Sequence, residues 1–423
     1  MNPPRAFKQH CRWRTLKAFA DHQEQSKAMF TDLELLPEDA ILGLAAACRE
    51  DPNPSKVDLS VGIYMDEDGV CPVFAAIKEA QKRLVDEEVS KAYLPAAGVK
   101  EFTQGIEDLL FGQDADRVDA ERVSSIQAPG GCGALKILAE VIRAAAPQAT
   151  VWVSDPSWPN HTPLLGGSGL KFQKYRYYDA TAHGVDFDGM MADLSNATAG
   201  DIVLLHGCCH NPCGADLSPE QWLETAALAQ TRGLVPLIDI AYQGLGSGLD
   251  ADAYGVRALV KALPEVMIAS SCSKNMGLYR ERTGCAVFVC QDQNGAKATL
   301  SQAKVAARRV YSMPPAHGGL LAGRVLSDDS LRAMWEQELS LMCERINGVR
   351  EQLVTKLEAA TGRDFGFIRH ENGMFSFLGL STYQVSRLRD EFSVYMVGSS
   401  RINVAGVNSR NIDYLADSVA AVL

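Results

Sequence analysis

A lysine with hydroxyl and guanidinium groups close to it in the sequence is the first feature that could carry chemistry. Lys274 follows the apolar run Val266–Ser270. Ser271 and Ser273 precede it, and Arg282 lies eight residues further on. Hydroxyls and a planar guanidinium suit the oxygens of a dianion, and a partly desolvated lysine beside cations has the lowered pKa that a nucleophilic amine needs. A lysine on a surface loop is the alternative, and the neighbouring motifs must decide between them.

A glycine-rich turn offers a second anion-binding feature. Gly131 and Cys132 lie in Gln-Ala-Pro-Gly-Gly-Cys-Gly-Ala-Leu-Lys, residues 127–136, ahead of an expected helix. Glycines let backbone N–H groups close on an anion, and the helix N-terminus adds its dipole. The segment is not a dinucleotide fingerprint, because Lys136 replaces the last glycine, and it lacks the G-K-[ST] ending of a P-loop. On this motif alone, an ordinary glycine-rich turn is an equal alternative.

Three further blocks follow expected strands and could hold a flat ring. Asp239 and Tyr242 come at the end of one such strand, where an acidic residue can hold a protonated pyridine nitrogen. Asn211 lies in a sharp Asn-Pro-Cys-Gly turn after another strand and can donate to a ring hydroxyl. Trp158 lies on a loop and could stack on the ring. Helix capping by Asp239 and core packing of Trp158 are the simpler alternatives.

The elements that must position these residues alternate along the middle of the chain, residues 72–341. Compact apolar runs suit strands buried on both faces of a mainly parallel sheet, and their alternation with amphipathic stretches predicts a layered α/β domain. Ala134–Ala144 and Pro219–Thr231 are expected helices, the second capped by Ser218 with Gln221 three residues later. The expected strands are Val151–Ser154, Ile202–His206, Leu234–Asp239, Val266–Ser270 and Cys285–Cys290.

The pattern changes after residue 340. A long helix is expected from Leu341 to about residue 360, then a strand at Met374–Leu378 and a helix capped by Ser381. These elements predict a smaller α+β domain. The expected division is therefore a disordered extension (1–28), an arm that joins the small domain (29–71), a large cofactor-binding domain (72–341) and a small C-terminal domain (342–423).

Composition excludes several classes of protein. The chain has 423 residues, which suits two domains, and 41 basic against 52 acidic residues, a net charge of −11. Clustered cations are therefore not expected, so we predict neither a nucleic-acid nor a membrane partner, and no segment reaches the roughly 18 apolar residues of a membrane span. The scattered cysteines, many in apolar runs, predict buried free thiols in the cytoplasm and no metal site. The basic start leaves open a mitochondrial presequence, or Met29 as the true first residue.

Together the five blocks resemble those of the class I aspartate and aromatic amino-acid aminotransferases, which have the pyridoxal-phosphate (PLP) fold type I. The resemblance runs from about Phe30 to the C-terminus, and the block S-x-S-K-N-x-G-L-Y-x-E-R-x-G is specific to that subgroup. It implies a large α/β domain, whose mainly parallel sheet of about seven strands lies between helices, and a smaller α+β domain. It also implies PLP as cofactor and ping-pong transfer of an amino group between aspartate, tyrosine or phenylalanine and 2-oxoglutarate.

The resemblance also implies roles for the catalytic residues. Lys274 would form the internal aldimine and move the proton between the substrate Cα and the cofactor. Asp239 would pair with the pyridinium nitrogen, supported by His161. Tyr242 and Asn211 would donate to the phenolate oxygen of the cofactor.

The remaining cofactor contacts follow in the same way. Trp158 would stack on the ring, and Tyr93 would reach the phosphate from the other subunit, which implies a homodimer with shared sites. Two positions depart from the family pattern. Cys132 stands where Ser or Thr is usual, and Cys213 replaces Thr in the Asn-Pro-Thr-Gly turn; we expect at most weaker cofactor affinity. The implied phosphate clamp is Gly131, Cys132, Ser271, Ser273 and Arg282.

Substrate carboxylates account for the other implied contacts. Arg401 would grip the α-carboxylate with a contact from Gly62, and Arg308 would bind a side-chain carboxylate across the dimer. The neighbouring Arg309 is interpreted as a solvated residue at a helix end. The implied substrate-binding set is Gly62, Trp158, Asn211, Arg308 and Arg401.

Two questions stay open at this point. Residues 239–254 look more like the aromatic branch, whereas Pro-Pro-Ala-His-Gly at 314–318 looks more like the aspartate branch. A PLP-dependent lyase that carries out β-elimination is the alternative activity on the same scaffold. A regulator without turnover is a third reading, but residues 1–28 are too short for the DNA-binding module that it would need.

Overall fold

The computed structural model describes residues 29–36, 40–112 and 118–423. It divides into two compact units, residues 1–40 and 41–423. In the described part of the first unit, the backbone N–H of Leu33 donates to the carbonyl of Phe30 at 3.2 Å and closes a turn. The extension expected at residues 1–28 lies outside the described residues. Everything below concerns the second unit.

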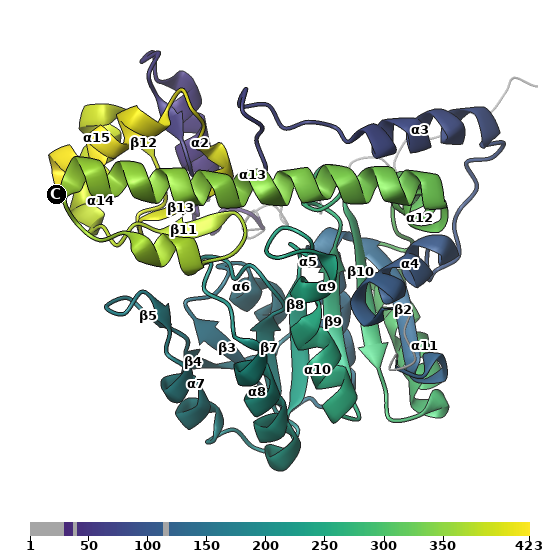
Figure 1. The fold of residues 1–423 in the computed structure, drawn as a ribbon. Coiled ribbons are helices and arrows are strands. Elements are labelled where there is room, and N and C mark those ends of the chain that lie inside the picture. Colours follow the sequence, from purple (N-terminus) through teal and green to yellow (C-terminus); the bar gives the residue numbers. More distant parts are fainter. Residues whose placement is uncertain (1–28, 37–39, 113–117) are drawn as a thin grey trace, which may run out of the picture. The chain divides into compact units, whose positions relative to one another are not determined.

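Among the described residues, seven strands form one sheet in the order β2-β10-β9-β8-β7-β3-β4 (Figure 1). The pairs β3–β4, β3–β7, β7–β8 and β8–β9 are parallel, whereas β10 runs antiparallel to both of its neighbours. The predicted mainly parallel seven-stranded sheet is thereby confirmed. The strands are β2 (Val123–Pro129), β3 (Thr150–Asp155), β4 (Lys171–Arg176), β7 (Ile202–His206), β8 (Val235–Ile240), β9 (Val266–Ser271) and β10 (Thr283–Val289).

Helices cover both faces of the sheet. Successive residues of a strand point to opposite faces, so they enter two different cores. In β7, Val203 and Leu205 belong to one core cluster, and Ile202 and Leu204 to the other. A strand buried on both faces has to be almost wholly apolar, and this is why apolar runs predicted it. The helices of the first core include α4 (Lys100–Phe111), α8 (Pro219–Arg232), α10 (Tyr254–Ala262) and α12 (Ala316–Ser327); those of the second include α5 (Gly130–Ala145) and α11 (Gln293–Val310).

Local signals set several boundaries as predicted. α8 begins after the N-cap Ser218, whose hydroxyl accepts from the backbone N–H of Gln221 while the Gln221 side chain bonds back to the cap. Gly233 ends the helix in the left-handed region, at φ 67°. α14 (Thr382–Phe392) has the same reciprocal cap at Ser381, as expected.

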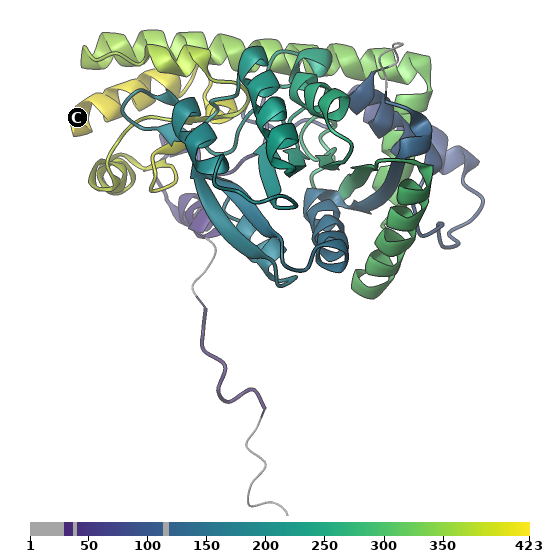
Figure 2. The same ribbon diagram turned by 90° about the horizontal axis from the view of Figure 1, so that it is seen from below.

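A third core joins the two ends of this unit. It brings Val57 and Leu59 together with buried residues between Val349 and Val422. The helix α13 (Asp329–Thr361) runs from the sheet region into this part of the chain, as Figure 1 and Figure 2 show. Its predicted start at Leu341 was wrong, because the Asp328 carboxylate caps an earlier first turn. Other elements near the two ends of this unit are β1 (Val57–Asp58), β11 (Phe375–Phe377), η2 (Gly366–His370), β12 (Val394–Tyr395), β13 (Arg401–Asn403), η3 (Val404–Gly406) and α15 (Ile412–Val422).

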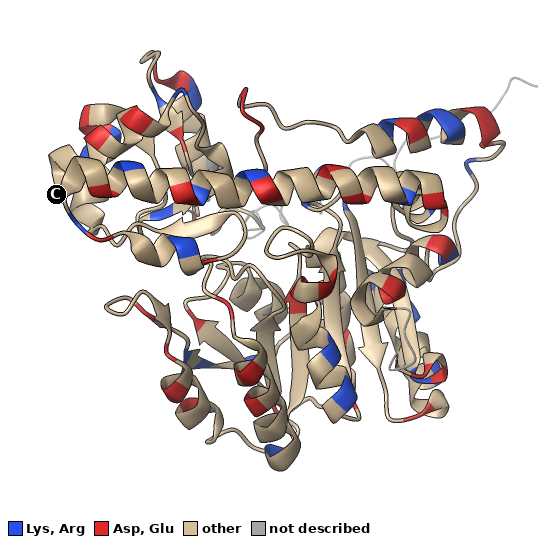
Figure 3. Cartoon of the chain, in the orientation of Figure 1, with Lys and Arg blue, Asp and Glu red and all other residues tan. Residues whose placement is uncertain are grey.

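The described helices carry charged residues of both signs. Acidic and basic residues alternate along α13 in Figure 3. No helix in the described ranges is long and apolar enough to cross a membrane. The elements not yet named are α2 (Ala40–Glu50), α3 (Ala75–Glu87), η1 (Ala120–Arg122), α6 (His161–Gly166), β5 (Tyr178–Asp179), β6 (Gly184–Val185), α7 (Phe187–Leu194) and α9 (Leu249–Asp252).

Candidate active site

A cavity of about 280 Å³ lies where the carboxyl ends of β7, β8 and β9 meet the N-terminus of α5. The carboxyl edge of parallel strands is the usual place for a site in such a sheet. The structure brings twelve of the predicted residues to this cavity. They are Gly62, Gly131, Cys132, Trp158, Asn211, Asp239, Tyr242, Ser271, Ser273, Lys274, Arg282 and Arg401.

One end of the cavity is arranged for an anion. A Cβ atom on Gly130 would lie 2.6 Å from Arg282 Nη2, and one on Gly131 would lie 3.3 Å from Ser271 Cβ, so the two glycines let the first turn of α5 approach these side chains. Ser271 Oγ donates to Ser273 Oγ at 3.1 Å. One part of the cavity is therefore lined by the unpaired N–H groups of a helix N-terminus, two hydroxyls and a guanidinium.

Lys274 lies beside this clamp. Its Nζ is 5.3 Å from the centroid of the Tyr242 ring. Burial, helped by the positive charge of Arg282, lowers the pKa of Lys274 from its ordinary value, although Asp239 opposes the shift. Burial also raises the pKa of Tyr242, which keeps its phenol protonated and able to donate. The lowered pKa makes the free amine, which can act as a nucleophile or a base, easier to form.

Asp239 is held from behind by histidines. His161 Nε2 lies 2.8 Å from Asp239 Oδ2, so the predicted contact is present. The other ring nitrogen of His161 lies 2.9 Å from Ser157 Oγ, which is also 3.1 Å from His206 Nε2. Burial lowers the pKa of His206 well below its usual value, so that histidine stays neutral. His206 therefore adds no positive charge beside Asp239.

The opposite end of the cavity is formed by distant segments. Arg401 donates through Nη2 to the Ser60 carbonyl, and its guanidinium lies 4.6 Å from the centroid of the Phe375 ring. Its Nε has no partner, although the residue is 97% buried, so one face of the fork is available to a ligand. A Cβ atom on Gly62 would lie 2.7 Å from Phe375 Cζ, which explains the glycine there.

Three predicted residues do not line the cavity. His161 lies behind Asp239, as described above. Tyr93 is 90% exposed, and Arg308, also exposed near the end of α11, bonds to Ser312 Oγ at 2.7 Å. Within one chain, therefore, neither Tyr93 nor Arg308 reaches the cavity.

Other lining residues were not among those predicted. Phe375 touches both Gly62 and Arg401, and Ile41 and Ala241 add apolar wall. Phe375 lies in Gly-Met-Phe-Ser-Phe, a buried strand segment whose apolar pattern indicates core. His206 and Cys208, by contrast, open the block that contains Asn211, so their place at a strand end was the available signal.

The two positions that depart from the family pattern differ in environment. Cys132 is partly exposed and lines the cavity, and its sulfur accepts from Asn160 Nδ2 at 3.7 Å. Cys213 is buried, with its sulfur 3.2 Å from His210 Nδ1, and burial raises the pKa of its thiol. Only the first can therefore contact a bound cofactor directly.

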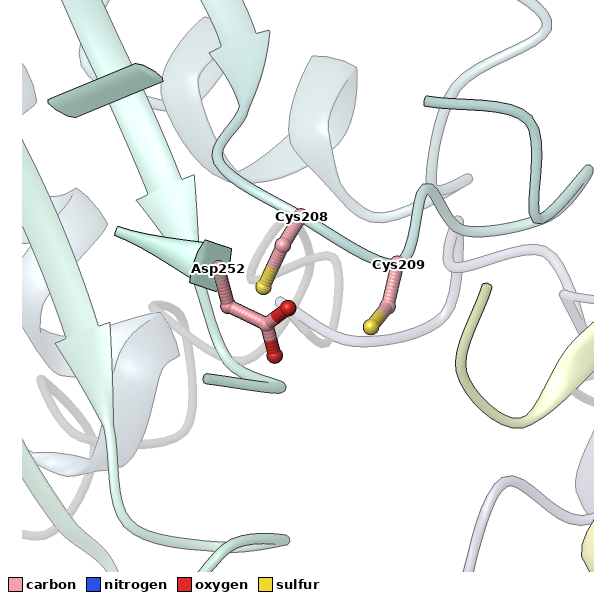
Figure 4. Close-up of side chains that lie close together, drawn as sticks. All are labelled: Cys208, Cys209 and Asp252. Carbon is pink, nitrogen blue, oxygen red and sulfur yellow. The ribbon is translucent and has the colours of Figure 1, made fainter. Parts of the chain in front are cut away.

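A cluster beside the cavity has the residue types of a metal site. The sulfur atoms of Cys208 and Cys209 and a carboxylate oxygen of Asp252 lie within 4.8 Å of one another (Figure 4). The Asp252 carboxylate already accepts from the backbone N–H groups of Gly244, Gly246 and Ser247. The hydrogen bond with Cys208 and then burial raise the pKa of the Cys209 thiol. The same hydrogen bond opposes the rise at Cys208, where burial still raises the pKa. Both shifts disfavour the thiolates that a metal needs. We interpret the carboxylate as a support for the loop.

A lysine that shares one cavity with an anion clamp and a carboxylate, at the carboxyl edge of this sheet, defines a PLP enzyme of fold type I. The sequence model of the family described as Aminotransferase class I and II matches residues 54–419. An aspartate aminotransferase of Haemophilus influenzae is 46% identical over 396 residues, 93% of this chain and 100% of the relative. An aromatic-amino-acid aminotransferase of Paracoccus denitrificans is 45% identical over 397 residues, again 93% and 100%.

Solved structures agree with this. The structure of an aromatic-amino-acid aminotransferase from Burkholderia pseudomallei, covalently bound to pyridoxal phosphate, superposes with a TM-score of 0.91 at 45% identity, covering 94% of this chain and 100% of that one. The chain therefore belongs to the aminotransferase class I and II family.

Proposed function

We propose that the chain is a PLP-dependent aminotransferase that moves an amino group between aspartate or an aromatic amino acid (tyrosine or phenylalanine) and 2-oxoglutarate by a ping-pong mechanism. The observation that carries this is the single cavity that Lys274 shares with the anion clamp and Asp239. The aspartate aminotransferase and the aromatic-amino-acid aminotransferase described above are 46% and 45% identical to this chain. The proposal therefore keeps both substrate classes.

The donor set fits the cofactor. The N-terminus of α5, Ser271, Ser273 and Arg282 suit a phosphate dianion. Asp239 suits a protonated ring nitrogen, and Trp158 offers an aromatic face. The buried Asn211 lines the cavity, and its side-chain oxygen has no partner. When bound, PLP supplies an electron sink for the charge that develops at the substrate Cα.

The chain's own residues would divide the remaining work. Lys274 Nζ, whose pKa is lowered by burial, would take the proton from the substrate Cα and return one. Tyr242 and Asn211 would donate hydrogen bonds to the ring oxygen. Arg401 would hold the α-carboxylate, with the N–H of Gly62, and so fix the Cα–H bond toward Lys274.

We further propose a homodimer with shared sites, in which Tyr93 and Arg308 complete the partner's cavity. Both residues are exposed in one chain, and exposed apolar side chains lie near them in the sequence. Val89 is 98% exposed on the segment of Tyr93, and Val310 is 47% exposed beside Arg308. Apolar side chains exposed beside polar ones are typical of a covered interface.

The domain division and location are also proposals. The third core, which joins Val57 and Leu59 to the C-terminal part, supports assigning the segment around these two residues to the small domain with residues 342–423. The many buried free thiols support a reducing cytoplasmic location.

The test is spectral and chemical. Purified protein with PLP should show an absorption band that shifts on adding aspartate or phenylalanine and returns with 2-oxoglutarate. Borohydride reduction followed by peptide mass spectrometry should place the cofactor on Lys274. Lys274→Ala should lose the band, and its turnover should fall by at least about 10⁴-fold. Lys174→Ala, at an exposed lysine on β4, is the matched control.

Two outcomes would contradict the proposal. A wild-type protein without a PLP-dependent band would end it. Pyruvate or ammonia release from cysteine-type substrates, independent of any oxo acid, would favour the lyase instead.

A further inference from the structure

Cys132 differs from the other cysteines in the described ranges in its access to a ligand. Eight of them are buried, and only Cys71 and Cys132 are partly exposed. Burial raises the pKa of the Cys71 thiol, and Cys71 does not line the cavity. Cys132 lines it together with Lys274 and Arg282. Cys208 also lines the cavity but is buried, so Cys132 is the more accessible of these two thiols to a reagent there.

The space around Cys132 is the space that an anion would use. The residue is in the first turn of α5, where Gly131 faces Ser271 so closely that a Cβ atom would lie 3.3 Å away. Independent orphan groups show that the cavity is built for a polar ligand. Asn211 Oδ1 and Arg401 Nε have no partners, although the two residues are 93% and 97% buried.

We propose that Cys132 is an oxidation and alkylation site that the bound cofactor shields, and that its modification excludes the cofactor's phosphate. This rests on the proposed function, because it takes the anion clamp as the phosphate site. With the cofactor in place, the phosphate covers the thiol. Without it, peroxide or an alkylating reagent enters the cavity, and the atoms added to sulfur occupy the clamp.

The chemistry needs only a peroxide. The thiol sulfur attacks one peroxide oxygen, the O–O bond breaks, and the products are a sulfenic acid at Cys132 and water. A second peroxide converts the sulfenic acid to a sulfinic acid and releases another water. The sulfinate is an anion, so Arg282 and the helix N-terminus that would bind phosphate stabilise it instead. The first product is reversible by thiols, whereas the second is not.

The experiment compares the holoenzyme with apoenzyme prepared by dialysis against inorganic phosphate and then exchanged into phosphate-free buffer. Each is treated with iodoacetamide or hydrogen peroxide, and the Cys132 peptide is quantified by mass spectrometry. Rebinding of PLP is then titrated by absorbance and fluorescence, which does not depend on turnover. Cys132→Ser, which keeps a small polar side chain, and Cys71→Ser are carried through the same treatments.

We expect Cys132 to be modified at least about tenfold more slowly in the holoenzyme when PLP exceeds its Kd tenfold. Treated wild-type and Cys71→Ser apoenzymes should lose PLP rebinding, and treated Cys132→Ser should keep it. Equal labelling of Cys132 with and without PLP, or an equal loss of rebinding in Cys132→Ser, would overturn the proposal. Failure of untreated wild-type apoenzyme to bind PLP would instead contradict the proposed function.

Discussion

The two ends of the cavity are built in different ways. At the cofactor end, Asp239, Lys274 and Gly131 follow or border strands of one sheet, and the structure brings each of them to the cavity. At the substrate end, Gly62 and Arg401 come from segments 339 residues apart, and Arg308 does not reach the cavity within one chain. Within one chain, all predicted phosphate-clamp residues therefore line the cavity while Tyr93 stays outside it, and of the two predicted carboxylate-binding arginines only Arg401 lines it.

This difference teaches where activity and specificity can be separated. Changes at the cofactor end should affect every substrate equally, because the group bound there is common to both half-reactions. Changes at the substrate end should divide substrates by the carboxylates that they carry.

The largest effect is expected at the cofactor end. Asp239→Asn removes the negative charge that would hold the ring nitrogen protonated, and kcat should fall by about 10³-fold for aspartate and phenylalanine alike. His161→Asn leaves that charge but removes its 2.8 Å support, so the loss should be about tenfold. Steady-state kinetics and the single-turnover half-reaction measure both. A loss confined to one substrate would show that this end is not common to them.

A smaller effect is expected at Arg401. Arg401→Lys keeps a charge but loses the bidentate fork, so kcat/KM should fall by about 10²-fold for both substrates, since both carry an α-carboxylate. PLP affinity, measured by fluorescence titration, should change little because the phosphate clamp is untouched. If PLP affinity falls in parallel with kcat/KM, the two ends are not independent.

Arg308 should divide the substrates. Arg308→Leu should lower kcat/KM for aspartate about 10²-fold, through loss of a paired carboxylate, and change phenylalanine by less than about threefold. Arg309→Leu, at the next exposed residue of α11, is the matched control and should leave both substrates unchanged. An equal loss for aspartate and phenylalanine would show that Arg308 does not bind the side-chain carboxylate.

Mixing subunits tests whether Arg308 acts across the proposed dimer. Toward aspartate, Lys274→Ala should be inactive and Arg308→Leu should keep only about one per cent of the wild-type kcat/KM. A hybrid of the two has one site with both wild-type residues if Arg308 is donated by the partner. Random exchange should then restore about a quarter of the wild-type activity, because half of the dimers are hybrids with one intact site each. Restoration to a few per cent or less would place Arg308 and Lys274 in the same subunit's site.

The same contrast explains what the sequence could predict. Apolar runs identified the inner strands, because those strands are buried on both faces, but the two edge strands were missed. Most residues of β4 are exposed, and β2 includes the polar residues Ser124, Ser125 and Gln127. The motif around Lys274 was readable because consecutive residues of one strand end form it. Phe375 could not be recognised as a site residue. Only the folded chain brings it to Gly62 and Arg401, and its own segment has only the pattern of a core strand.

The smallest effect concerns two histidines, His206 and His210, in the block that also contains Asn211. Burial lowers the pKa of His210 to about 3, and lowers that of His206 as well, whereas an unfolded histidine titrates near 6.5. Below pH 6.5 the unfolded chain binds protons that the native state does not, so the unfolding free energy should fall as pH falls toward 3. Each histidine contributes a slope of up to about 1.4 kcal/mol per pH unit in that window. Urea unfolding of the holoenzyme at pH 7.5, 6.5 and 5.5 measures the slope, which should be shallower in His210→Asn. A slope that is unchanged in His210→Asn would mean that His210 gains its proton in the native state as well.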